Sequence, residues 1–289
     1  MNEQKTIVLG RSNEDVFTLN FNNTPHVLIC GGVGAGTTHL GKLIAQKCMS
    51  ELNGKLFIVD KRREEFEEFE SLGVDMLPNL EVAFLEKIRD QHDQRIEQLK
   101  TSHCKNIEEY NKKFPNEPIT RIFILIHDVD HFLLDEEICS SMGTIIRICR
   151  STGIHLIITA KDPHNLQSNH IHNIGIKFCG SGLDQERINK LMFKTSPAPQ
   201  ELHRWTFYYH MNGKEGYVAV GSFEEDRERA FIEDIEARER SKRNMVKQVA
   251  AEFLRAAVAN GFTIGDLSEA IETLQDEAKN LKVLLNQFD

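Results

Sequence analysis

Short apolar runs, separated by stretches with the pattern of helices, limit this chain to few architectures. Ile122, Phe123, Ile124, Leu125 and Ile126 are consecutive, and a strand of that composition is buried on both faces. Similar strand-like runs lie at 26–30, 55–60, 154–160 and 174–179. Helix-like stretches lie between them at 38–52, 81–100 and 139–150. This alternation predicts an α/β sandwich, a doubly wound and mostly parallel sheet with helices on both faces.

Two further pairs of short runs predict hairpins. The runs at 6–9 and 16–20 form one pair, and those at 206–210 and 216–220 form a second, which we expect at an edge of the sheet. After residue 223 the composition changes to a dense mixture of both charges. We therefore expect an α/β domain over 1–223 and a helical tail over 224–289.

The last part of the tail carries a heptad-like pattern. Asn260 and Gly261 end one predicted helix, and Thr263 can cap the next. Apolar residues then recur at alternating spacings of three and four: Ile264, Leu267, Ile271, Leu274, Ala278, Leu281 and Leu285. Such a seam packs against a partner helix in an oligomer or hetero-complex, or docks as an amphipathic helix on its own domain. The pattern leaves both interpretations open.

Composition excludes several classes of protein. The net charge of −9 argues against a chain that coats nucleic acid with its whole surface, although a local basic channel remains compatible with it. No stretch approaches the length of an apolar membrane span, and the polar first residues do not form a signal peptide. Six cysteines without a CxxC pair indicate neither a disulfide scaffold nor a zinc ribbon. We expect a cytoplasmic protein.

A glycine-rich loop follows the strand-like run at 26–30 and opens the next helix. Its residues are Gly31, Gly32, Val33, Gly34, Ala35, Gly36, Thr37 and Thr38. The two outer glycines and Thr38 fit the phosphate-loop pattern G-x-x-x-x-G-K-S/T, in which the last hydroxyl binds Mg²⁺. The lysine of that pattern, which places a charge against the β- and γ-phosphates, is Thr37. The loop predicts a phosphate site formed by backbone N–H groups, with one cation missing.

Four segments resemble, in order, motifs of the motor domain of the FtsK/SpoIIIE family of DNA-translocating ATPases. They lie at 24–29, 57–61, 95–111 and 150–163. The resemblance implies a RecA-like P-loop NTPase fold with a helical C-terminal appendage. It also implies ATP with Mg²⁺ as ligand, double-stranded DNA as partner, and assembly into an oligomer.

This chain differs from the family's motifs at positions to which the resemblance assigns catalytic roles. Besides Thr37, the position of the metal-ligating aspartate is His127, and the catalytic glutamate corresponds to Asp128. The glutamine that senses the γ-phosphate corresponds to Lys161, and the arginine beside it to Asp162. Phosphoryl transfer depends on positioning and on neutralising phosphate charge, so these exchanges remove most of the catalytic machinery. Lys161 is one candidate to replace the missing lysine.

Other residues permit a functional and a structural interpretation. Arg147 and Arg150 lie on one predicted helix and could act in trans across a subunit boundary, or could simply stabilise a helix C-terminus. His127 and His131 have the spacing of a helical zinc pair, but without a third ligand we interpret them as polar side chains. The aromatic run at 205–209 is more simply part of a packed hairpin than a base-stacking surface.

Three functions follow from these observations. The first is a pseudo-ATPase subunit or regulator of a DNA-translocation, conjugation or secretion machine. The second is an active ATP-dependent DNA translocase that uses Lys161 and Asp128 in shifted roles. The third is an adaptor that works mainly through its C-terminal helix.

Overall fold

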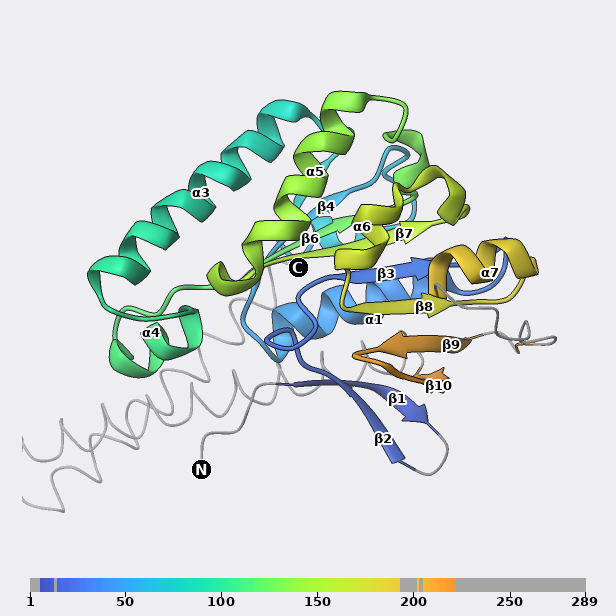
Figure 1. Ribbon diagram of the computed structural model, residues 1–289, viewed down its shortest axis with the longest axis horizontal. Helices are drawn as coiled ribbons and strands as arrows, with labels where there is room; N and C mark the ends of the chain where they lie inside the picture. The colour runs from blue at the N-terminus through green and yellow to red at the C-terminus, as the bar shows by residue number, and fades with distance from the viewer. Residues whose placement is uncertain (1–5, 13–14, 193–201, 203–204, 222–289) are drawn as a thin grey trace, which may run out of the picture. The chain divides into compact units, whose positions relative to one another are not determined.

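The computed structural model describes residues 6–12, 15–192, 202 and 205–221. These residues build one ten-stranded sheet with the order β2-β1-β10-β9-β8-β3-β7-β6-β4-β5 (Figure 1). The predicted domain boundary at 223, the charged segment after it and the whole apolar seam lie outside the described residues. The roles predicted for the tail therefore stay predictions.

Six strands form a parallel block, and the other four are antiparallel. The parallel strands are β3 (Val27–Cys30), β4 (Lys55–Val59), β5 (Asp75–Leu77), β6 (Ile122–Ile126), β7 (Ile154–Ala160) and β8 (Ile176–Cys179). The antiparallel strands are β1 (Ile7–Ser12), β2 (Asp15–Leu19), β9 (Thr206–Met211) and β10 (Lys214–Val220). Every residue of β3, β6, β7 and β8 is buried, as their mostly apolar sequences predict, and His155, Thr159 and Lys177 are the polar residues among them.

Helices cover both faces of this sheet. They are α1 (Thr37–Ser50), α2 (Glu67–Glu70), α3 (Val82–Thr101), α4 (Ile107–Lys113), α5 (Glu136–Ile148), α6 (Ser168–Asn173) and α7 (Gln185–Met192). Three 3₁₀ turns connect elements: η1 (Val129–His131), η2 (Cys149–Thr152) and η3 (Pro163–Asn165). One apolar cluster joins α1 and α2 to the sheet, and a second joins α3, α5, α6 and α7 to its other face. The predicted α/β sandwich of the P-loop NTPase type is confirmed.

The second hairpin is not where the sequence analysis placed it. β9 pairs with β8 and β10 pairs with β1, so this hairpin lies inside the sheet, and the β1–β2 hairpin forms the edge (Figure 1). Phe207 and Val218, one on each strand, are fully buried in the cluster beneath α1. At an edge, one strand of the hairpin would leave backbone N–H and C=O groups unpaired, and pairing with β8 and with β1 satisfies both strands.

The predicted helix at 139–150 also differs from the observed one. α5 begins earlier, where the Asp135 carboxylate accepts hydrogen bonds from the backbone N–H groups of Glu137 and Ile138. It ends at Ile148, and η2 follows. Arg147 and Arg150 therefore lie on two different elements and not on one helical face. No helix among the described residues combines the length and the apolar character that crossing a bilayer requires.

Candidate nucleotide site

A cavity of about 460 Å³ opens where the carboxyl ends of β3, β4, β6 and β7 meet. In an open α/β sheet this edge is the usual place for a ligand. The cavity brings together most of the site residues that the sequence predicted: Gly31, Gly32, Val33, Gly34, Gly36, Thr37, Thr38, His127, Asp128 and Lys161. Ala35, the remaining loop residue, is buried and does not line the cavity.

The glycine loop has the backbone shape of an anion site. Gly34 and Gly36 have φ values of +84° and +90°, a region that side chains other than glycine rarely adopt. Gly36 precedes α1, and the first hydrogen bond inside that helix runs from the Leu40 N–H to the Gly36 carbonyl. The N–H groups of Thr37 and Thr38 consequently have no acceptor inside the helix. The loop thus fits a phosphate group, which the helix N-terminus attracts.

His127 stands at the end of β6, where the resemblance implies a metal-binding carboxylate. Its Nδ1 lies 3.0 Å from the Thr159 hydroxyl, and its ring packs edge-on against Phe66 at 5.1 Å between centroids. Burial lowers the pKa of His127, although the nearby Asp128 and Asp60 oppose this effect. The imidazole is therefore neutral at neutral pH, and the cavity holds no negative charge at this position.

Asp128 and Lys161 form an ion pair at the rim of the cavity. Asp128 has a left-handed backbone with φ of +48°, and its N–H donates to the Thr159 hydroxyl at 2.9 Å. The Lys161 ammonium contacts the Asp128 carboxylate. Lys161 thus lies in the same cavity as the glycine loop, as its candidate role requires, but its charge is shared with the predicted catalytic acid.

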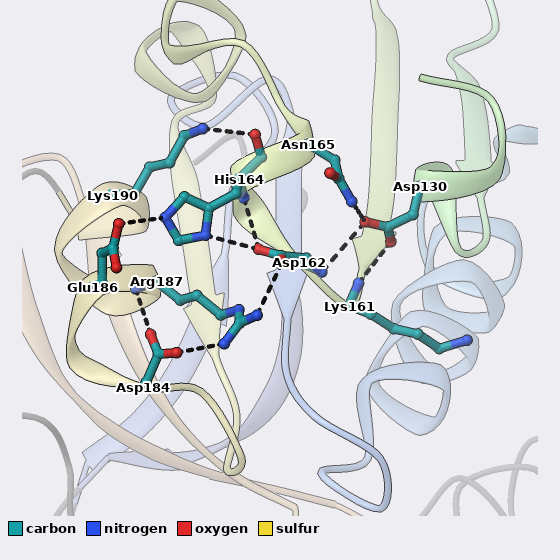
Figure 2. Close-up of polar contacts among 9 residues, drawn as sticks. All are labelled: Asp130, Lys161, Asp162, His164, Asn165, Asp184, Glu186, Arg187 and Lys190. Carbon is teal, nitrogen blue, oxygen red and sulfur yellow. Dashed lines mark hydrogen bonds and ion pairs between the residues drawn. The ribbon is translucent and has the colours of Figure 1, made fainter. Parts of the chain in front are cut away.

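A polar network behind the cavity fixes this part of the chain (Figure 2). Asp130 accepts hydrogen bonds from the Lys161 N–H at 2.8 Å, from the Asp162 N–H and from the Asn165 amide. The Lys161 side chain points away from this network (Figure 2). Asp130 is therefore a positioning residue, which holds the backbone from which Lys161 projects.

Several residues that line the cavity were not predicted as site residues, and Lys42 and Trp205 are two of them. Lys42 follows Thr38 by one helical turn, a spacing that places both on one face of α1. Its Nζ lies 2.8 Å from the Glu68 carboxylate and 5.5 Å from the centroid of the Phe66 ring. The helical spacing was the signal that could have revealed this lysine.

Trp205 is the second of these residues. Its ring stacks on His39, with 4.6 Å between centroids and 16° between planes, and it lines the cavity beside the glycine loop. A Cβ at Gly36 would lie 2.7 Å from Trp205 Cδ1, so this approach also requires glycine. Only the tertiary fold brings Trp205 to the loop, and no local pattern predicts that contact.

Magnesium fits the cavity poorly. The Thr38 hydroxyl is in place, but two of the three carboxylates that line the cavity with it are engaged, and the third, Glu65, is exposed. Asp128 pairs with Lys161, and the two oxygens of Asp60 accept the N–H groups of Arg62 and Glu65 at 3.2 and 3.3 Å. Among the described residues no group of three or more His, Cys, Asp or Glu side chains is arranged to hold a metal ion. Phosphate thus fits the site, and a resident Mg²⁺ does not.

Arg147 and Arg150 are exposed and do not line this cavity. Arg147 lines a second cavity of about 440 Å³ together with residues of α5 and α6, including the buried His170. Arg150 belongs to η2. Their action across a subunit boundary stays a prediction.

Comparisons with known proteins converge on one family. The chain is 25% identical over 179 residues to the DNA translocase FtsK of Chlorobaculum tepidum, a match that covers 54% of this chain and 22% of that protein. It is 22% identical over 253 residues to the FtsK of Staphylococcus aureus, covering 78% and 32%. The resemblance to the FtsK/SpoIIIE motor domain is confirmed. These matches span between about a fifth and a third of the FtsK chains.

Solved structures agree on the fold. The conjugation coupling protein TcpA of pCW3, solved with ATPγS, superposes with a TM-score of 0.70 at 22% identity, over 78% of this chain and 68% of TcpA. EssC of Geobacillus thermodenitrificans superposes with a TM-score of 0.60 at 13% identity, over 76% and 45%. At these identities the likeness establishes the FtsK-like P-loop fold. No family model matches the chain.

Proposed function

We propose that this chain is a degenerate FtsK/SpoIIIE-like protein, a pseudo-ATPase subunit or regulator of a DNA-translocation, conjugation or secretion machine. One observation carries the proposal. In the cavity, the positions of the phosphate-loop lysine and of the metal acid hold Thr37 and the neutral His127, and Asp128 is paired with Lys161. The phosphate cradle persists beside them, so binding and catalysis are separated in this site.

Stabilisation of negative charge on the phosphates separates an active site from an inactive one. Hydrolysis of ATP proceeds through a transition state whose charge is stabilised by the loop lysine, by Mg²⁺ and by the groups that hold the attacking water. A carboxylate that is held in an ion pair accepts a proton poorly, because the neighbouring ammonium favours its charged form. Loss of the lysine contact alone weakens ATP binding by about 2–4 kcal/mol unless another cation takes its place.

The setting of the chain in a machine rests on its relatives. FtsK is named a DNA translocase, TcpA a conjugation coupling protein and EccC of Thermomonospora curvata a type VII secretion ATPase. By analogy we propose an oligomeric assembly in the cytoplasm, with double-stranded DNA as a partner. The adaptor function would reside in the tail, outside the described residues.

The alternative function is an active translocase, and one contact favours it. Lys161 lines the cavity beside Asp128, so a cation and an acid are both present near the phosphate cradle. In an active translocase, Lys161 would neutralise charge on the γ-phosphate and Asp128 would position the attacking water. The two functions differ in turnover, which a single assay measures.

We expect phosphate release from ATP and Mg²⁺ to stay at the background rate, with and without duplex DNA. The matched variant is Thr37→Lys with His127→Asp, which restores both missing charges and is expected to raise turnover if the cradle is otherwise intact. Should the wild-type chain hydrolyse ATP, and Asp128→Asn stop it at an unchanged melting temperature, the active translocase replaces the pseudo-ATPase.

A further inference from the structure

We propose that the glycine-loop cavity binds the polyphosphate of a nucleoside triphosphate without a divalent metal, with the ammonium groups of Lys161 and Lys42 in place of the cation. The inference deepens the proposed function and rests on the cavity being a nucleotide site. It concerns how phosphate charge is neutralised, and not whether ATP is hydrolysed.

The first observation concerns the position where the resemblance implies a carboxylate that binds Mg²⁺. Mg²⁺ takes oxygen ligands in a strict octahedral arrangement and binds carboxylates in preference to imidazole. At the end of β6 the side chain at that position is His127, whose Nδ1 lies beside the Thr159 hydroxyl and whose ring packs on Phe66. The ring is thus fixed by two neighbours, and it offers no oxygen to a metal.

The second observation concerns the state of the remaining carboxylates. Asp60 is buried, and its two oxygens hold the backbone of residues 62 and 65. Asp128 is held by the Lys161 ammonium. These contacts fix the orientation of both carboxylates, and Glu65 is the remaining carboxylate that lines the cavity.

The third observation concerns the positively charged side chains that could contact phosphate in the cavity. Lys42 and Lys161 come from α1 and from the end of β7, and both line the cavity with the loop, as do Lys61 and Arg62. The two ammonium groups carry the formal charge of one divalent cation, and each is paired with a carboxylate. Each has three N–H donors, so it can keep its carboxylate partner and still donate to a phosphate oxygen. Glu68 and Asp128 therefore hold the two ammonium groups in place before the ligand arrives.

The fourth observation concerns the orientation of Lys161. Its backbone N–H donates to Asp130, which also accepts from the next residue and from Asn165, and its side chain points away from this network (Figure 2). Lys161 lines the cavity. Pre-organised charges act without the reorganisation that a flexible lysine requires. The backbone from which Lys161 projects is thus fixed at the rim, at the position where the resemblance implies a glutamine.

The test compares the affinity of the full-length protein for ATP in excess EDTA and in excess Mg²⁺, by isothermal titration calorimetry. Trp205 is the only tryptophan of the chain and lines the cavity, so its fluorescence gives a second, independent readout. We expect binding in EDTA at least as tight as in Mg²⁺, because the metal neutralises phosphate charge that the lysines would otherwise contact. Lys161→Met and Lys42→Met should each weaken binding in EDTA by about tenfold or more, the loss of one charge-assisted contact.

Two variants make the result interpretable. Lys87→Met removes an exposed lysine of α3, outside the cavity, and should leave the affinity unchanged. His127→Asp supplies the missing carboxylate and should make binding tighter in Mg²⁺ than in EDTA. Melting temperatures of all four variants show whether each is folded.

The outcomes separate this inference from the proposed function. Binding that needs Mg²⁺, or no binding in either buffer, overturns the inference and leaves the pseudo-ATPase proposal standing if phosphate release is at background. Binding in EDTA that Lys161→Met and Lys42→Met leave intact also overturns it. Mg²⁺-dependent hydrolysis by the wild-type chain overturns both.

Discussion

Asp162 shows how a residue at a catalytic position can serve structure. The resemblance implies an arginine at this position, yet its carboxylate accepts hydrogen bonds from Arg187 Nη2 at 3.1 Å and from the His164 N–H at 2.9 Å (Figure 2). Partial burial would raise the pKa of Asp162, but the hydrogen bonds from Arg187 and His164 outweigh it and lower the pKa to about 2. The charged form is thus favoured in the folded protein.

This depressed pKa has a consequence for stability. The unfolded pKa of an aspartate is about 3.9, so the stabilisation by Asp162 is complete above that value and is lost as the pH falls toward 2. Asp162→Asn should remove about 0.5–1 kcal/mol at neutral pH, because solvent screens the group, and should flatten the decline of unfolding free energy between pH 4 and about 2. Urea unfolding at several pH values measures this, with Asp90→Asn on the exposed face of α3 as control. A decline identical to that of the wild type contradicts the assignment.

Single residues differ in how far the sequence reveals them. The glycine loop could be predicted because its spacing is local and its backbone requirement is specific. The pairing of Asp128 with Lys161 could not, since it depends on how β6 and β7 place their ends side by side. Asp130 was equally hidden, because two of its three partners are backbone N–H groups, which nearly every residue carries.

At the scale of elements, the turn from η2 into β7 is the most constrained connection. Gly153 has φ of +68°, and a Cβ there would lie 2.2 Å from Ile107 Cδ1. Arg95 of α3 donates to the Thr152 carbonyl at 2.7 Å and also to the Thr120 carbonyl. One arginine thereby ties the starts of β6 and β7 to α3.

Two alanine substitutions, one in this turn and one in the β9–β10 turn, separate backbone strain from crowding. Gly213, in the β9–β10 turn, has φ of +77° and nothing within 4 Å of a Cβ position, so Gly213→Ala should cost about 1–2 kcal/mol. Gly153→Ala adds a clash with Ile107 and should cost about 2–4 kcal/mol. Chemical denaturation of both variants measures the difference. Equal losses would mean that Ile107 moves aside freely.

The buried strands were the most predictable elements, because a short, continuous apolar run such as Ile122–Ile126 is typical of a strand that is buried on both faces. Short elements were missed: α2, β5, α4, α6 and α7. Of these, α4 carried a signal, since the Asn106 side chain caps the Glu109 N–H and the Glu109 carboxylate accepts from the Lys105 N–H. β5 has three residues, too few for a sequence pattern, and it is defined by its parallel pairing with β4.

At the scale of the whole molecule, assembly remains a prediction from the tail sequence. Six seam positions, each worth about 1.5–3 kcal/mol when buried, suffice to hold an oligomer or a partner helix. Deleting residues 261–289 should lower the mass seen by light scattering and leave the α/β domain with a cooperative thermal transition. Loss of that transition would assign the tail to the core of its own domain.

β1 and β10 are the first and the last described strands along the chain, and they pair with each other inside the sheet. A ribosome releases β1 early and β10 some two hundred residues later. Throughout that interval the β1–β2 hairpin lacks its inner neighbour, and an isolated hairpin is only marginally stable. β8 likewise presents a bare edge until β9 has been synthesised. Nascent chains that stall before residue 206 therefore expose two unpaired strand edges, which makes them natural clients for chaperones and targets for degradation.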